Sequence, residues 1–153
     1  FHHAGSSSGV VDGAAAVLLA SKRYASDQGW TPRARVVATA NIGDDPTLML
    51  NAPGPAARKV LAKAGLSIDD IDLWEVNEAF AVVTMAAMKE FDIPHNKVNI
   101  HGGACALGHP IGASGAVLAT RLMHSMQRDG LKRGIVTLCI GGGQGIALAI
   151  EML

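Results

Sequence analysis

The sequence predicts an α/β domain, and three observations lead to this prediction. Short runs rich in Val, Ile and Leu alternate with longer helix-forming stretches, an order typical of a sheet covered by helices. The length of 153 residues fits one domain, which we place over residues 1–153. Hydrophobic residues make up 49% of the chain and charged residues 17%, which indicates a folded globule rather than a disordered segment.

The first predicted strand lies near the N-terminus, where an apolar run gives way to polar residues. Residues 14–20 are uninterrupted apolar, and their pattern alone does not separate a buried strand from a buried helix. The change to polar residues at Ser21 favours a strand over 14–20, followed by a short helix that ends at Gly29.

The remaining elements follow from the same two patterns. Each predicted strand is a short run of β-branched and other apolar residues, and each predicted helix is longer. Two of these helices end at Gly65 and Gly130, residues suited to a helix C-terminus. We expect strands over 35–40, 72–76, 134–140 and 146–152 and helices over 56–64, 78–91 and 113–128. The glycines at 141–143 turn the chain so that the last two strands pair antiparallel, giving a five-stranded mixed sheet covered by helices.

Charge, cysteine content and hydropathy restrict the function. Lys plus Arg and Asp plus Glu are equal at 13 each, so the chain has no general attraction for nucleic acid. Two cysteines form no dense disulfide framework, which indicates thiols in a reducing compartment. No run approaches the roughly 20 apolar residues that span a bilayer, and no secretory signal is evident. We therefore expect a cytoplasmic protein with no membrane association, and the alternative is an organellar protein whose targeting signal precedes Phe1.

The segment Asn77-Glu78-Ala79-Phe80 is the first candidate site. It stands where a predicted strand ends and a helix begins, the place where α/β folds present ligand-binding groups. A purely structural alternative is that Asn77 caps the helix, with Glu78 in its first turn.

His109 lies in the second candidate site, a glycine-rich stretch over 101–115, between Gly108 and Pro110. A histidine held on such a rigid loop can activate a nucleophile or polarise a carbonyl; the alternative is an incidental surface histidine. His101, Cys105 and His109 are spaced four apart, as metal ligands on one helix face would be. We expect no metal, because glycine and proline disfavour a helix there and no fourth ligand is evident.

Cys139 marks the third candidate site, at the end of a predicted buried strand and before the glycines 141–143. A thiol beside free backbone N–H groups suits an acid–base group next to an oxyanion hole. The alternative is a structural cysteine packed beside a tight turn.

These segments, in this order, resemble the thiolase family. The resemblance rests on V-N-E-A-F-A at 76–81, G-G-A-C-A-L-G-H-P-I-G-A-S-G at 102–115 and C-I-G-G-G-Q-G at 139–145. An opening S-S-G-V-V-D-G-A-A-A at 7–16 is similar to the family's N-A-S-G-x-N-D-G-A-A. A thiolase subunit holds two similar halves, and this chain resembles the second from residue 4 onward, which implies a thiolase-like C-terminal half.

The resemblance implies a role for each matched residue. His109 would activate the nucleophilic cysteine and help to bind the thioester oxygen, and Cys139 would carry the proton for the second substrate. Asn77 would hold a water that completes one oxyanion hole, and the backbone N–H of Gly141 would contribute to the other. Ser8 would contact the pantetheine arm of coenzyme A.

The resemblance also implies substrates and partners. Coenzyme A and acyl-CoA would be substrates, with no permanently bound cofactor. The nucleophilic cysteine belongs to the family's N-terminal half, and neither Cys105 nor Cys139 occupies its motif. That half would be a partner, and the family forms dimers or tetramers. Ser6, Val11 and His101 depart from the family's usual residues, which affects only the packing on the coenzyme A side.

We therefore expect acyl transfer: thiolysis of a 3-ketoacyl-CoA, or the reverse Claisen condensation, by a chain that is inactive without the N-terminal half. Phe1 stands where the loop domain of a full thiolase ends, which suggests a fragment. Two alternatives remain. One is a non-catalytic module that binds coenzyme A or a partner, and the other is an enzyme of the ketoacyl-synthase kind, disfavoured because those use a histidine where this chain has Cys139.

Overall fold

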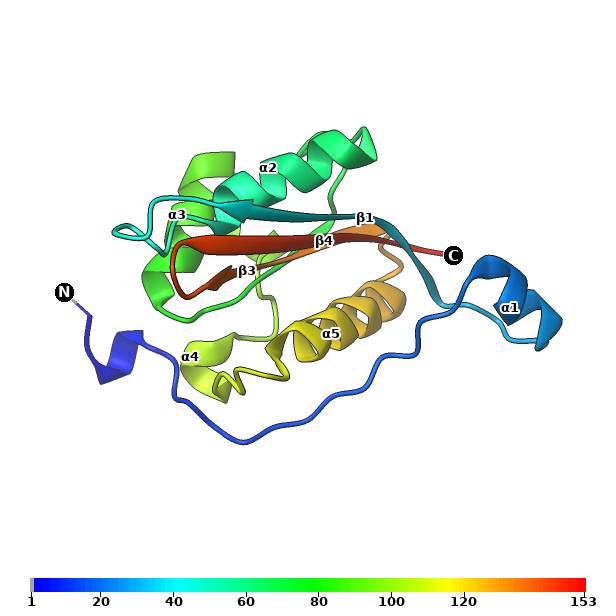
Figure 1. Ribbon diagram of the computed structural model, residues 1–153, viewed down its shortest axis with the longest axis horizontal. Coiled ribbons are helices and arrows are strands. Elements are labelled where there is room, and N and C mark those ends of the chain that lie inside the picture. The colour runs from blue at the N-terminus through cyan, green and yellow to red at the C-terminus, as the bar shows by residue number, and fades with distance from the viewer. Residues whose placement is uncertain (1) are drawn as a thin grey trace.

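A computed structural model describes residues 2–153, and Phe1 lies outside the described residues. The described residues form one four-stranded sheet with helices on both faces (Figure 1). The elements in order are η1 (Ala4–Ser6), α1 (Lys22–Asp27), β1 (Ala34–Gly43), α2 (Pro53–Ala64), β2 (Leu73–Val76), α3 (Ala81–Phe91), η2 (His95–Lys97), α4 (Ala104–Leu107), α5 (Ser114–Asp129), β3 (Arg133–Ile140) and β4 (Gln144–Met152).

The sheet is mixed and has the strand order β1-β4-β3-β2. β3 and β4 form an antiparallel hairpin, β4 pairs antiparallel with β1, and β2 pairs parallel with β3. The α/β class, the mixed sheet and the closing hairpin are confirmed. Because β2 and β3 run in parallel, the two strands end at the same edge of the sheet. The segments that follow Val76 and Ile140 therefore come close together.

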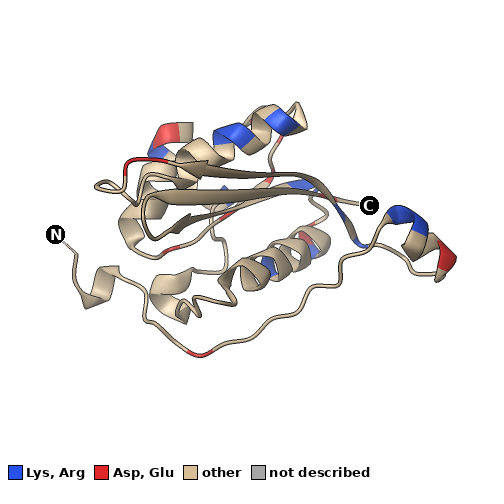
Figure 2. Ribbon diagram, in the orientation of Figure 1, with Lys and Arg blue, Asp and Glu red and all other residues tan. Residues whose placement is uncertain are grey.

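The prediction of a fifth strand is wrong. Residues 14–20 are extended but pair with no strand among the described residues, and Leu18 and Leu19 are 77% and 74% exposed. Figure 1 shows this segment running outside the sheet on the α5 side. Asp12 is the one charged residue between η1 and α1, and Figure 2 accordingly shows a single red patch along this stretch. An apolar run indicates that a segment needs burial, but it does not specify the surface that buries it.

The helix boundaries follow local signals. The short helix predicted after Ser21 is α1, and the Ser21 hydroxyl caps it by accepting a hydrogen bond from Tyr24 N (3.1 Å). α2 begins three residues earlier than predicted, because Pro53 is tolerated in a first turn, and it ends at Gly65 with φ +66°. α3 begins at Ala81 rather than at residue 78, which frees the preceding residues for the site.

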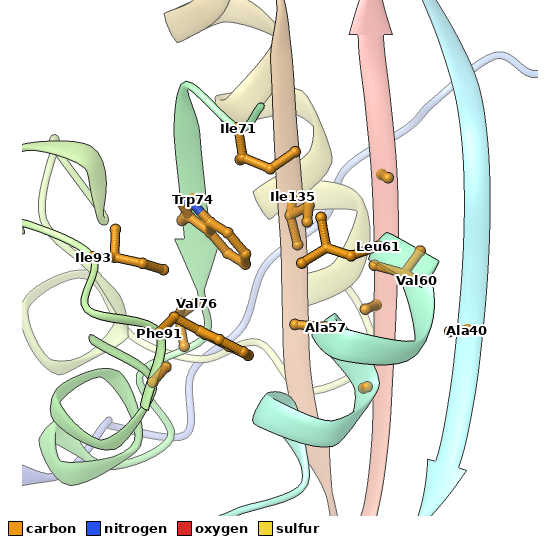
Figure 3. Packing of buried hydrophobic residues seen from close by; sticks show 14 of the residues in the cluster. Ala40, Ala57, Val60, Leu61, Ile71, Trp74, Val76, Phe91, Ile93 and Ile135 are labelled. Carbon is orange, nitrogen blue, oxygen red and sulfur yellow. The ribbon is translucent and has the colours of Figure 1, made fainter. Parts of the chain in front are cut away.

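Two hydrophobic clusters fix the layers. On one face α2 and α3 pack around Trp74, whose ring stacks on Phe91 with centroids 5.6 Å apart (Figure 3). On the other face α5 buries Leu122 and Met126 against the sheet. No helix among residues 2–153 is long and apolar enough to cross a membrane.

Candidate active site

A cavity of about 540 Å³ opens where β3 ends, between the Asn77–Phe80 turn and the start of α5. His109, Cys139 and Gly141 line it together, although they come from two distant parts of the sequence. The rest of the lining is almost entirely apolar, and it comprises Met49, Leu50, Ala79, Phe80, Ile111, Gly115, Val136, Leu138, Ile140, Ile146, Ala147 and Leu148.

His109 is held at both its backbone and its ring. Its backbone N–H donates to Gly9 O (2.8 Å), so the N-terminal segment supports the histidine loop. The ring nitrogen Nδ1 lies 2.5 Å from Ser114 Oγ, and Nε2 lies 3.3 Å from Asn77 Nδ2. Burial lowers the pKa of His109 below its ordinary value, which keeps the imidazole neutral at neutral pH. A neutral imidazole can accept a proton from a neighbouring group.

Asn77 lies directly after β2 and is 2% exposed. Its backbone N–H donates to Thr137 O (3.0 Å), which continues the pairing with β3, while its side chain lies against His109. The alternative that Asn77 caps a helix is wrong, because Phe80 is the N-cap residue of α3. The side-chain amide is therefore free to serve the site.

Cys139 is the penultimate residue of β3 and is half-buried beside the cavity. Burial raises the pKa of its thiol, so the group is a neutral thiol at neutral pH. Gly141 follows in the turn to β4, where Gly143 has φ +78° and approaches the backbone of Asp44 too closely for a side chain. The turn therefore requires glycine and keeps backbone near the thiol.

Ser8 lies beside the Asn77–Phe80 turn and is not among the residues that line the cavity. Its hydroxyl and its backbone N–H both donate to Ala79 O, each at 3.1 Å. These bonds tie the N-terminal segment to the turn after β2.

Cys105 lies away from the cavity lining. Its backbone N–H donates to the Glu78 carboxylate (3.2 Å), and its thiol donates to Glu78 O (3.8 Å). No group of three or more His, Cys, Asp or Glu side chains within residues 2–153 is arranged to hold a metal ion. The alternative of a site built from His101, Cys105 and His109 therefore has no ligand set there.

Two glutamates anchor the glycine-rich loop, a role that the sequence does not predict for either of them. Glu78 accepts from Asn99 Nδ2 (2.8 Å) as well as from Cys105 N. Glu75 is fully buried, and its carboxylate lies 3.6 Å from Arg121 Nη2, which also donates to Gly102 O. The one feature of the sequence that could have indicated this role is the pair of glutamates that flank Val76-Asn77, one of which lies within an apolar strand.

Ser114 is a third residue of the site whose role the sequence does not predict. It is 3% exposed, begins α5, and contacts the His109 ring. The signal is a serine five residues after the histidine, which becomes meaningful only once Pro110 is known to turn the chain back.

Residues 30–152 match the family described as thiolase, C-terminal domain. The chain belongs to the thiolase family. A 3-ketoacyl-CoA thiolase of Aliivibrio salmonicida is 50% identical over 151 residues, covering 97% of this chain and 39% of that protein. An acetyl-CoA acetyltransferase of Syntrophomonas wolfei is 51% identical over 152 residues, covering 98% of this chain and 38% of that protein.

A solved thiolase structure matches the fold as well. The crystal structure of human mitochondrial 3-ketoacyl-CoA thiolase in complex with CoA has a TM-score of 0.90 and 41% identity, covering 98% of this chain and 38% of that one. The chain thus spans less than two fifths of the length of these thiolases.

Proposed function

We propose that this chain is the part of an acyl-transferring thiolase that supplies the acid–base groups, His109 and Cys139, for reactions of coenzyme A thioesters. The observation that carries the proposal is that both side chains line one largely apolar cavity. Thiolysis of a 3-ketoacyl-CoA breaks a carbon–carbon bond and transfers the acyl group from a cysteine thiol to the thiol of coenzyme A. It therefore needs a base that deprotonates the attacking thiol and an acid that protonates the leaving carbon.

The opposite pKa shifts of the two groups support this division of roles. Burial lowers the pKa of His109 and raises the pKa of Cys139, so at neutral pH the cavity holds a neutral base and a neutral thiol acid. Groups whose surroundings push their pKa values apart are typical of acid–base pairs.

In the first half of thiolysis, a nucleophilic cysteine outside this chain transfers its proton to His109 and attacks the 3-keto carbon. The bond between C2 and C3 of the substrate then breaks, and Cys139 protonates the departing carbanion, which leaves as acetyl-CoA. Asn77, beside the His109 ring, would hold a water that completes one oxyanion hole, and the backbone N–H of Gly141 would contribute to the other.

In the second half, the thiol of coenzyme A transfers its proton to the Cys139 thiolate and attacks the acyl-cysteine. The acyl group moves to coenzyme A, and the nucleophilic cysteine leaves and recovers its proton from His109. Both side chains return to their starting states. The reverse sequence is the Claisen condensation of two acyl-CoA molecules, and Ser8 would contact the pantetheine arm in either direction.

The nucleophile would come from the N-terminal part of a thiolase, which is the partner we propose. Val10, Leu18 and Leu19 are 79%, 77% and 74% exposed on the uncharged stretches of the N-terminal segment, and apolar surface of this kind is typical of a protein interface. The whole assembly would be a dimer or tetramer in the cytoplasm, where the two thiols stay reduced.

The decisive test is a chimera in which this chain replaces the matched region of the A. salmonicida thiolase. Thiolysis of acetoacetyl-CoA by the chimera, lost in the His109→Ala chimera, would support the proposal. A chimera that binds coenzyme A by calorimetry without turnover would favour the alternative of a binding module.

A further inference from the structure

We propose that Ser114 is a positioning residue that fixes the His109 ring in one tautomer, with the proton on Nδ1 and the lone pair on Nε2. The inference concerns the ground state of the ring; only its catalytic consequence rests on the proposed function.

The first argument comes from the Ser114 hydroxyl, which has a single proton to donate. Oγ lies 3.0 Å from Pro110 O, a carbonyl that can only accept. Ser114 is 3% exposed, so solvent offers it no other partner. Pro110 O also accepts from the backbone N–H groups of Ala113 (2.7 Å) and Ser114 (2.9 Å), and two oxygens that both present lone pairs at 3.0 Å repel each other, so Oγ contacts it as a donor. The hydroxyl then offers a lone pair to His109 Nδ1 at 2.5 Å, which favours a hydrogen on Nδ1.

The second argument comes from the opposite side of the ring and is independent of the first. His109 Nε2 lies 3.3 Å from Asn77 Nδ2, an amide nitrogen that can donate but not accept. In this arrangement Nε2 accepts, which agrees with a lone pair there. Both sides of the ring lead to the same tautomer.

The consequence is that the basic atom of His109 is Nε2. Imidazole in water exchanges between two tautomers, and the hydrogen bond at one nitrogen decides which is populated. Because burial keeps the ring neutral, the tautomer rather than the charge decides which nitrogen can take a proton. Ser114 thus presents the same basic atom in every molecule.

The test is a long-range proton–nitrogen NMR correlation on the 153-residue chain with ¹⁵N-labelled histidine, at a pH above the ordinary histidine pKa. The His109 signals are those lost in His109→Asn. We expect a pyrrole-type shift for Nδ1 and a pyridine-type shift for Nε2. A pyridine-type Nδ1 in the wild type would overturn the proposal, whatever the variants do.

Three variants separate positioning from general structural damage. In Ser114→Ala we expect the two His109 nitrogen shifts to move toward each other, as the Nε2–H tautomer becomes populated. Ser114→Thr keeps the hydroxyl and should restore the wild-type shifts. Ser125→Ala removes another buried serine about three turns further along α5 and should leave the shifts unchanged. Wild-type shifts in a folded Ser114→Ala would show that Ser114 does not select the tautomer.

Because no substrate is present in this measurement, its outcome is separate from that of the proposed function. An inactive chimera with the expected shifts would leave the positioning role standing. An active chimera with the opposite tautomer would remove the positioning role alone.

Discussion

The Glu78 carboxyl group fills the space that a Cβ atom on Gly103 would occupy. From that position it accepts hydrogen bonds from Asn99 Nδ2 and from Cys105 N. The turn after β2 is therefore joined directly to the loop that carries His109. A side chain at residue 103 would displace the Glu78 carboxyl group from these two hydrogen bonds.

Gly103→Ala is therefore expected to destabilise the fold. The new methyl group displaces the Glu78 carboxyl group from its hydrogen bonds with Asn99 Nδ2 and Cys105 N, and leaving buried polar groups without partners costs roughly 1–3 kcal/mol. Gly112→Ala is the matched control, because a Cβ there meets nothing within 4 Å. Urea unfolding measures both, and an equal loss in the two variants would contradict the close contact.

The sequence predicts most of the core elements because their signals are local. β3 and α5 were each predicted to within one residue at both ends, from an apolar run and from Gly130. The prediction of a strand over 14–20 is wrong for a non-local reason, because these apolar residues pair with no sheet edge among residues 2–153. An apolar run indicates that a segment becomes buried, but it does not identify the surface against which it packs.

The sequence predicts which residues belong to the candidate site, but it does not predict the hydrogen bonds that hold them. His109, Asn77 and Cys139 stand out through their motifs. The contacts to Ser114, Asn99 and Glu78 depend on turns at positions such as Asn99, which has φ +47°, and no pattern in the sequence specifies them. Family resemblance assigns roles to matched residues but leaves the residues that hold them unassigned.

Glu75→Gln is expected to stabilise the protein above neutral pH. Burial raises the pKa of Glu75 from 4.5 to about 7, so its stabilisation of the fold is lost as the pH rises from 4.5 to about 7. Glutamine stays neutral throughout. At roughly 1.4 kcal/mol per pKa unit, the variant should gain about 3 kcal/mol over the wild type in alkaline solution.

Urea unfolding of the wild type and of Glu75→Gln, on each side of this pH window, measures the effect. Glu90→Gln serves as the control, because Glu90 is partly exposed and pairs with Arg58 at the surface. A constant difference between wild type and Glu75→Gln across the window would show that Glu75 does not titrate there.

His109→Ala in the chimera is expected to lower kcat/KM by roughly 10²–10⁴-fold, the range typical of a lost general base. In the unsubstituted chimera, activity should fall with decreasing pH as the imidazole is protonated. The midpoint should lie below 6.5, because burial lowers the pKa of His109 from that value. A midpoint above 6.5 would contradict the role of a buried neutral imidazole.

Substitution of the two cysteines by alanine should affect the turnover of the chimera differently. Cys139→Ala removes the proposed proton carrier, and roughly 10²–10⁴-fold lower turnover is expected in the chimera. Cys105→Ala changes a thiol outside the cavity lining and should leave turnover within a few-fold. Full condensing activity in Cys139→Ala would remove this residue from the mechanism.

In the function we propose, this chain holds the acid–base groups of a thiolase and the nucleophile comes from another part of the enzyme. The most direct measurement is acetoacetyl-CoA thiolysis by the 153-residue chain alone, compared with the same chain in the chimera. We predict turnover in the chimera and none from the chain alone. Turnover by the chain alone would contradict this prediction, because Cys105 or Cys139 would then have to be the nucleophile.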